Sequence, residues 1–145
     1  MKSIALCHAQ IQRILLTTAL SFGLAVGGYG LAHAEVRQEI NEQQISYQTG
    51  GVGQEELEEL RQQASSYNTQ FSFANASDRA YLNNLQVRIL DADENLIFED
   101  ADVGPLLYLQ LEPGNYEIIA THENVEKKQT FSIKADSTFK EALTW

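Results

Sequence analysis

The sequence predicts a mainly β domain, an antiparallel β-sandwich of about seven strands preceded by one N-terminal helix. Three observations predict it. From position 69 onward, short runs alternate apolar and polar residues; turn residues separate these runs about every ten residues; and one earlier stretch shows helical spacing instead. Residues 35–145 are long enough for one domain with a modest core.

The first 34 residues have the features of a secretory signal peptide. Lys2 and Arg13 supply positive charge, residues 14–26 are mostly apolar, and an Ala-x-Ala sequence ends at Ala34. We therefore expect cleavage between Ala34 and Glu35, which would release a periplasmic or secreted protein without stable membrane insertion. The alternative is an uncleaved anchor, because the apolar stretch approaches the length of a membrane span.

Residues 35–53 are polar and end in Gly50-Gly51-Val52-Gly53, which predicts a flexible lead-in. The next segment, 54–67, is predicted to be a helix with one narrow apolar stripe. Four glutamates fall in its first turns, where the helix dipole favours negative charge. The stripe consists of Leu57, Leu60, Ala64 and Tyr67.

Residues 68–145 are predicted to form the sandwich. An Asp- and Asn-rich turn at 91–95 and the Pro113-Gly114 turn separate its strands. The predicted strands cover residues 69–74, 85–89, 96–98, 106–111, 116–122, 125–134 and 138–145.

Alternation along these strands predicts which side chains form the core. The inward set is Val87, Ile89, Phe98, Leu107, Leu109, Leu111, Tyr116, Ile118, Ala120, Phe131, Ile133, Phe139 and Leu143.

Three apolar residues break the pattern: Leu106, Tyr108 and Ile119 are predicted to face outward on two neighbouring strands. An apolar patch of this kind requires a cover, and the helix stripe is the simplest one. The alternative is an exposed patch that binds a partner.

Composition excludes several classes of function. Residues 35–145 hold all 20 acidic residues and eight of the ten basic ones, so their formal charge is −12. This charge argues against binding of nucleic acid or anionic membrane surfaces. The same segment contains no Cys, no Met and a single His, His122. Thiol catalysis, disulfides and Cys-rich or His-rich metal sites are thereby excluded, and we expect neither a cofactor nor a metal.

Three weaker motifs favour structural explanations. The glycines at 50–53 precede a helix like a phosphate-binding loop, but the glutamates that follow would repel phosphate. Asp91, Asp93 and Asn95 imitate the start of a calcium loop that lacks the required Gly and the final Glu, so a hairpin turn is favoured over weak calcium binding. His122 could act as a general base only beside a nucleophile, and no Ser or Thr of the sequence lies in a nucleophile motif.

Aromatic residues suggest a second kind of function. Tyr67, Tyr81, Tyr108 and Trp145 could stack on sugars, although Tyr67 and Trp145 are better explained by packing. The candidate binding patch is therefore Leu106, Tyr108, Ile119 and Tyr81.

The run Leu111-Glu112-Pro113-Gly114-Asn115-Tyr116-Glu117-Ile118 resembles the L-x-P-G-x-Y-x-[IV] turn of carboxypeptidase regulatory-like domains, which share a prealbumin-like, Ig-like β-sandwich. Most of 49–134 also resembles small exported proteobacterial proteins that carry this domain. The resemblance implies the fold and an accessory role, and it transfers no catalytic residue.

The expected function is therefore an exported, non-enzymatic module that acts as an accessory or protein-interaction domain in the cell envelope. The alternative is a module that binds carbohydrate, either peptidoglycan or an exopolysaccharide. A third class, a small hydrolase or protease inhibitor, finds little support in the residue inventory.

Overall fold

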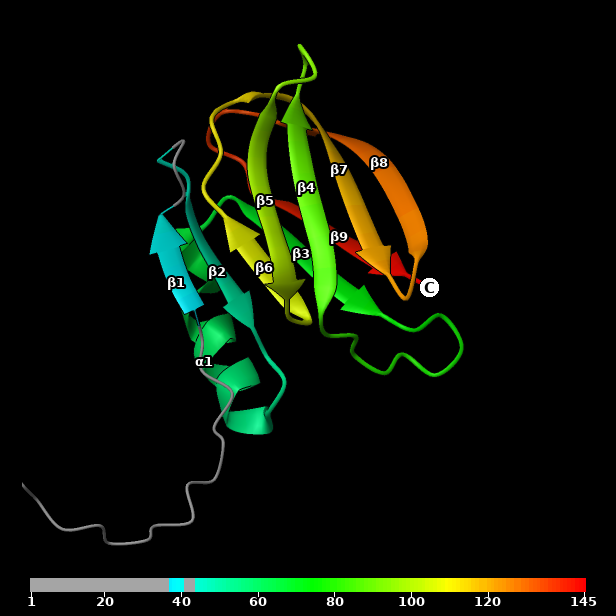
Figure 1. The fold of residues 1–145 in the computed structure, drawn as a ribbon. Helices are drawn as coiled ribbons and strands as arrows, with labels where there is room; N and C mark the ends of the chain where they lie inside the picture. The colour runs from blue at the N-terminus through cyan, green and yellow to red at the C-terminus, as the bar shows by residue number, and fades with distance from the viewer. Residues whose placement is uncertain (1–36, 41–43) are drawn as a thin grey trace, which may run out of the picture. The chain divides into compact units, whose positions relative to one another are not determined.

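The computed structural model describes residues 37–40 and 44–145, which form two β-sheets packed as a sandwich with one helix (Figure 1). The predicted signal peptide and the cleavage site between Ala34 and Glu35 lie outside these residues. The elements are β1 (Arg37–Ile40), β2 (Ser46–Gly50), α1 (Gln54–Gln63), a 3₁₀ turn (Ala64–Ser66), β3 (Thr69–Ala74), β4 (Leu85–Asp91), β5 (Leu96–Val103), β6 (Leu106–Leu109), β7 (Gly114–His122), β8 (Val125–Ile133) and β9 (Phe139–Thr144).

One sheet has five strands in the order β1-β2-β6-β3-β9, and the other has four in the order β5-β4-β7-β8. Neighbouring strands are antiparallel except β3 and β9, which run parallel. The mainly β sandwich predicted from the sequence is confirmed. The count of about seven strands is too low, because β1 and β2 were not expected.

The core lies between the sheets and contains every residue of the predicted inward set, with Tyr116 and Phe139 only partly buried. In β3 and β4, buried and more exposed residues alternate strictly at first, as expected for strands with one face on the core. Five buried apolar residues of the core were not in the predicted inward set: Tyr47, Phe71, Phe73, Leu85 and Val103.

The predicted flexible lead-in is wrong over residues 37–40 and 46–50, which form β1 and β2. β2 pairs with β6 and is almost wholly buried. The burial of β2 was not predicted because Gln48 and Thr49 are polar. Their side chains form hydrogen bonds inside the protein. Thr49 Oγ1 donates to the Leu106 carbonyl, and Gln48 Nε2 donates to Gln63 Oε1.

Helix α1 begins at Gln54 as predicted, but it ends at Gln63 and gives way to the 3₁₀ turn before Tyr67. It packs on the outer face of the five-stranded sheet. Leu60 and Tyr67 form a second apolar cluster there with Leu106 and Tyr108, with Leu57 and Ala64 at its margin. The prediction that the helix stripe covers Leu106 and Tyr108 is confirmed.

Ile119 does not belong with Leu106 and Tyr108. The chain crosses from one sheet to the other between β6 and β7, so these two strands are not neighbours, as the sequence analysis assumed. Ile119 lies on the outer face of the four-stranded sheet, opposite Arg88 on β4 and Lys128 on β8, and is only 5% exposed. The predicted three-residue patch is therefore not one surface.

Candidate functional site

Three of the four predicted site residues, Leu106, Tyr108 and Tyr81, lie on the outer face of the five-stranded sheet. The bridge between Ala74 and Tyr81 extends the line of β6, so Tyr81 is presented on the same face as Tyr108. Tyr81 is 45% exposed, whereas Leu106 and Tyr108 are each 5% exposed beneath the helix. Tyr81 is therefore the accessible member of the predicted patch.

Arg61 on α1 joins these tyrosines, although it was not among the predicted site residues. Its guanidinium donates to the Tyr81 hydroxyl at 3.2 Å. Burial raises the pKa of Tyr108, the nearby positive charge of Arg61 opposes this rise, and Tyr81 adds to it. Arg61 and both phenols thus share one electrostatic environment. Only its position in the last turn of the helix, four residues after Leu57 and so next to the stripe, could have indicated this role.

A groove of about 320 Å³ opens beside the helix over β3 and β9, and we call it the helix-side groove. Its lining residues come from β3, β6 and β9: Gln70, Phe71, Ser72, Leu106, Tyr108, Lys140, Glu141 and Ala142. Gln70 also fixes the helix end, because its Nε2 donates to the carbonyls of Ala64 and Tyr67. Gln70 therefore links the lining of the groove to the end of the helix.

The glycine-rich loop before α1 holds a carboxylate of the chain itself. Glu56 is 7% exposed, and its Oε2 accepts hydrogen bonds from the backbone N–H of Val52 at 2.9 Å and of Gly53 at 3.4 Å. Gly50 has φ +150°, and a Cβ there would overlap Glu56 Oε1. The Glu56 carboxylate thus satisfies the N–H groups of the loop and caps the start of the helix.

Glu56→Gln is expected to lower the free energy of unfolding by about 1 kcal/mol, because a neutral amide oxygen replaces a charged acceptor. Chemical denaturation measures this change. Glu55→Gln is the matched control: Glu55 lies in the same first turn and is exposed, so it shares only the effect of the helix dipole. Equal losses in both variants would contradict the capping role of Glu56.

The Asp-rich turn between β4 and β5 is organised by Asp91. Its Oδ1 accepts hydrogen bonds from the N–H groups of Asp93 and Asn95, each at 2.9 Å, and from the Asn95 side chain. Hydrogen bonds from Asn95 hold the pKa of Asp91 below its usual value. This arrangement fits the hairpin interpretation of the motif. Within the described chain, no three His, Cys, Asp or Glu residues are placed to share a metal ion.

His122 ends β7 beside the C-terminal tryptophan. Its ring lies 6.3 Å from that of Trp145, and the Trp145 Nε1 donates to the Val125 carbonyl at 3.0 Å. Lys127 Nζ sits 5.5 Å from the Trp145 ring centroid. The aromatic ring thus ties the ends of β7, β8 and β9 together, in agreement with the packing role predicted for Trp145.

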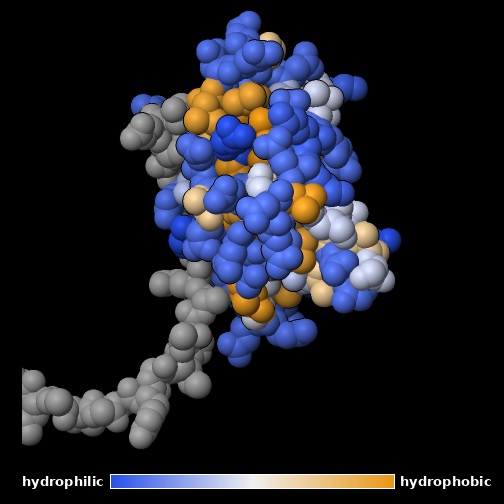
Figure 2. All heavy atoms as spheres, turned by 45° about the vertical axis from the view of Figure 1, so that its right-hand side comes forward, coloured by the Kyte–Doolittle hydropathy of each residue, from blue (hydrophilic) through white to orange (hydrophobic). Residues whose placement is uncertain are grey.

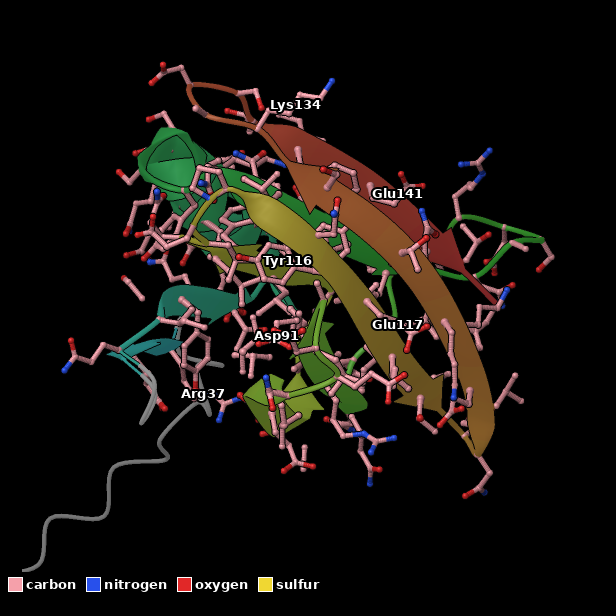
Figure 3. All side chains as sticks on the ribbon, turned by 90° about the horizontal axis from the view of Figure 1, so that it is seen from above. Arg37, Asp91, Tyr116, Glu117, Lys134 and Glu141 are labelled. Atoms are coloured by element: carbon pink, nitrogen blue, oxygen red, sulfur yellow. The ribbon has the colours of Figure 1, made fainter. Side chains whose placement is uncertain are left out.

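The two edges of the four-stranded sheet differ. At β5, the pairing with β4 shifts register twice, and Arg37 reaches across from β1 (Figure 3). Arg37 forms an ion pair with Asp100 at 3.1 Å and also donates to the Asp102 carbonyl. This edge is irregular and covered.

At β8, all nine residues pair with β7 in unbroken register, and β8 forms the outer margin of its sheet (Figure 1). Figure 2 turns this side forward and shows a largely hydrophilic surface with smaller apolar areas. β8 is therefore a long, regular edge strand. Its period-2 sequence could have predicted a strand, but not its position at an edge.

None of the helices in the described part of the chain is long and apolar enough to cross a membrane. A comparison of the sequence with protein-family profiles and with curated proteins found no match.

Proposed function

We propose that this domain is an exported, non-enzymatic interaction module of the cell envelope that binds an extended segment of a partner protein along β8. The observation that carries the proposal is the unbroken nine-residue register of this edge strand. Such an edge presents unpaired N–H and C=O groups at regular intervals, which is how a sheet accepts an added strand.

The charges around β8 favour an acidic partner segment. All four lysines of residues 35–145 lie on β8, on β9 or between them: Lys127, Lys128, Lys134 and Lys140. Glu126 pairs with Lys128 at 3.3 Å and with Arg88 at 3.6 Å, so part of this charge is already balanced. The remaining lysines would repel a second copy of β8 and attract acidic side chains opposite.

The turn between β6 and β7 supports the narrower assignment to carboxypeptidase regulatory-like, prealbumin-like domains, which we also propose. Leu111 is 3% exposed in the core, and Tyr116 stacks on Phe131 with ring centroids 5.5 Å apart. The Tyr116 hydroxyl donates to the Glu112 carbonyl at 2.8 Å. Leu111 and Tyr116 of that motif thus each have a structural role here, which supports the resemblance without requiring a catalytic role.

Hairpin geometry indicates which N–H groups face the open edge. The β7–β8 turn consists of Glu123 and Asn124, both with positive φ, and His122 pairs with Val125 across it. In such a two-residue hairpin the flanking residues form a hydrogen-bonded pair, and bonded pairs then alternate. The even-numbered residues of β8, including Thr130, should therefore direct their N–H outward.

Thr130→Pro is expected to weaken partner binding about tenfold, equivalent to the loss of about 1.4 kcal/mol, because it removes one outward donor at an edge that tolerates proline. Partner binding is measured by replacing Lys128 with a photo-crosslinking residue in cells that export the protein. Mass spectrometry then identifies and quantifies the crosslinked partner. Thr130→Val is the matched control because it keeps the N–H.

The proposal expects a protein adduct from position 128 in the parent and in Thr130→Val, with a much weaker one in Thr130→Pro. Equal adducts in all three proteins would contradict strand addition. An adduct from a probe at Leu96 on β5, with none from position 128, would move the interface to the other edge.

A further inference from the structure

We propose that the seam between β8 and β9 selects which segment adds to β8, an inference that rests on the proposed function. The seam consists of inward-facing residues of these two edge strands: Lys127, Gln129, Phe131, Phe139 and Glu141. The preferred segment carries an apolar side chain opposite Phe131 and an acidic one opposite Lys127, four residues apart on one face. Main-chain pairing with β8 supplies affinity, and the seam supplies specificity.

β8 and β9 are edge strands of different sheets, and they lie on the same side of the sandwich. Phe131 on β8 stacks on Phe139 of β9, with ring centroids 5.0 Å apart. Toward the other end, the indole of Trp145, which follows β9, donates to the Val125 carbonyl of β8. The two strands therefore run alongside each other in opposite directions, and the inner face of a strand added to β8 would cover the seam.

The pairing of β8 with β7 shows which of its side chains point inward. Lys127 pairs with Ala120 and Gln129 pairs with Ile118, and both β7 residues are fully buried in the core. Because the members of a pair share a face, Lys127 and Gln129 point toward the core side and are partly buried, whereas the residues between them along β8 are exposed. Alternate side chains of an added strand would therefore meet Lys127, Gln129 and Phe131 in turn.

Lys127 carries the charge that favours an acid on the added strand. Among the described residues, the Lys and Arg side chains in ion pairs with carboxylates are Arg37, Arg88 and Lys128. Lys127 Nζ instead lies 5.5 Å from the centroid of the Trp145 ring. A carboxylate opposite Lys127 would give this charge a partner at a partly buried position, where salt screens the attraction less than on the outer face.

The rest of the seam disfavours an acid at the other two inner positions. Glu141 pairs with Phe71, which faces the core, so its side chain leaves β9 on the same face. Because β8 and β9 run in opposite directions from the contact between Phe131 and Phe139, Glu141 lies nearest Gln129 and would repel an acid placed there. The two phenylalanine rings favour an apolar residue at the remaining position.

NMR titration of the isotope-labelled exported protein with two synthetic peptides tests the inference. Both peptides consist of serine and threonine with one isoleucine and one glutamate. These two residues are four positions apart in the first peptide and two apart in the second, so composition and face are the same. Each peptide is made in both chain directions, because either strand orientation keeps the spacing. We expect both peptides to shift the β8 amides, and the first to bind about fivefold more tightly.

Lys127→Gln should abolish this preference, because the glutamate then has no cation opposite it. Lys128→Gln is the matched control: it removes the same charge from the outer face of β8 and should keep the preference. Equal affinity of the two peptides for the parent, or an unchanged preference in Lys127→Gln, would overturn the inference while strand addition stands. If neither peptide shifted the β8 amides, strand addition itself would fail, and the inference would fail with it.

Discussion

Phe71→Ala is expected to lower the free energy of unfolding by about 3–5 kcal/mol, the usual cost of truncating a buried phenylalanine. Phe71 is 1% exposed and its ring contacts rings from both sheets. It packs edge-on against Phe131 at 5.2 Å and Phe139 at 5.8 Å, and it stacks near Phe73. Removing the ring would leave a cavity between the sheets, and several aromatic contacts would be lost.

Urea denaturation followed by tryptophan fluorescence measures this loss, because Trp145 packs against Phe73 in the same core. A domain of this size has only about 5–15 kcal/mol of stability, so partial unfolding at room temperature is a compatible result. Val52→Ala is the control, since Val52 is 56% exposed and should change stability by less than about 0.5 kcal/mol. A loss below about 1 kcal/mol in Phe71→Ala would contradict the two-sheet core.

The core strands could be predicted because apolar residues recur at every second position of a strand with one buried face. Leu107 and Leu109 can face the core together only if Tyr108 between them faces outward, and the structure agrees. Which strands pair with each other was harder to predict from the sequence. Pro113 and Gly114 indicate a turn, but not whether the next strand stays in the same sheet or crosses to the other. Ile119 was assigned to the wrong surface for this reason.

The site shows the same division. Tyr81 and Tyr108 could be chosen from the sequence because exposed or unexplained aromatic residues are unusual. Arg61 could not, because its role depends on a hydrogen bond to a residue twenty positions away. Arg37 likewise acts through β5, which is distant in sequence. The long-range partners of charged side chains depend on how the strands are arranged in the two sheets. The alternation of apolar and polar residues does not predict that arrangement.

Gly104→Ala is expected to destabilise the fold by about 1–3 kcal/mol, because the added methyl group has no space. A Cβ on Gly104 would lie 2.8 Å from the Gly50 Cα and oxygen, which are backbone atoms and cannot rotate away. The Gly104 N–H also donates to Thr49 Oγ1 at 2.9 Å, so β2 is held directly against this turn. The substitution should push β2 away from β6 and loosen the loop that Glu56 caps.

Chemical denaturation gives the size of the loss, and hydrogen exchange of the β2 amides shows where it acts. Gly53→Ser is the matched control: a Cβ there meets nothing within 4 Å, and serine is a favourable N-cap, so stability should hold or rise slightly. β2 was not predicted as a strand because its sequence is polar. Its burial depends on the close approach of the Gly50 and Gly104 backbones. If Gly104→Ala were as stable as the parent, with unchanged exchange in β2, residues 46–50 would not lie against the β5–β6 turn. The segment would then return to the flexible lead-in that its composition predicts.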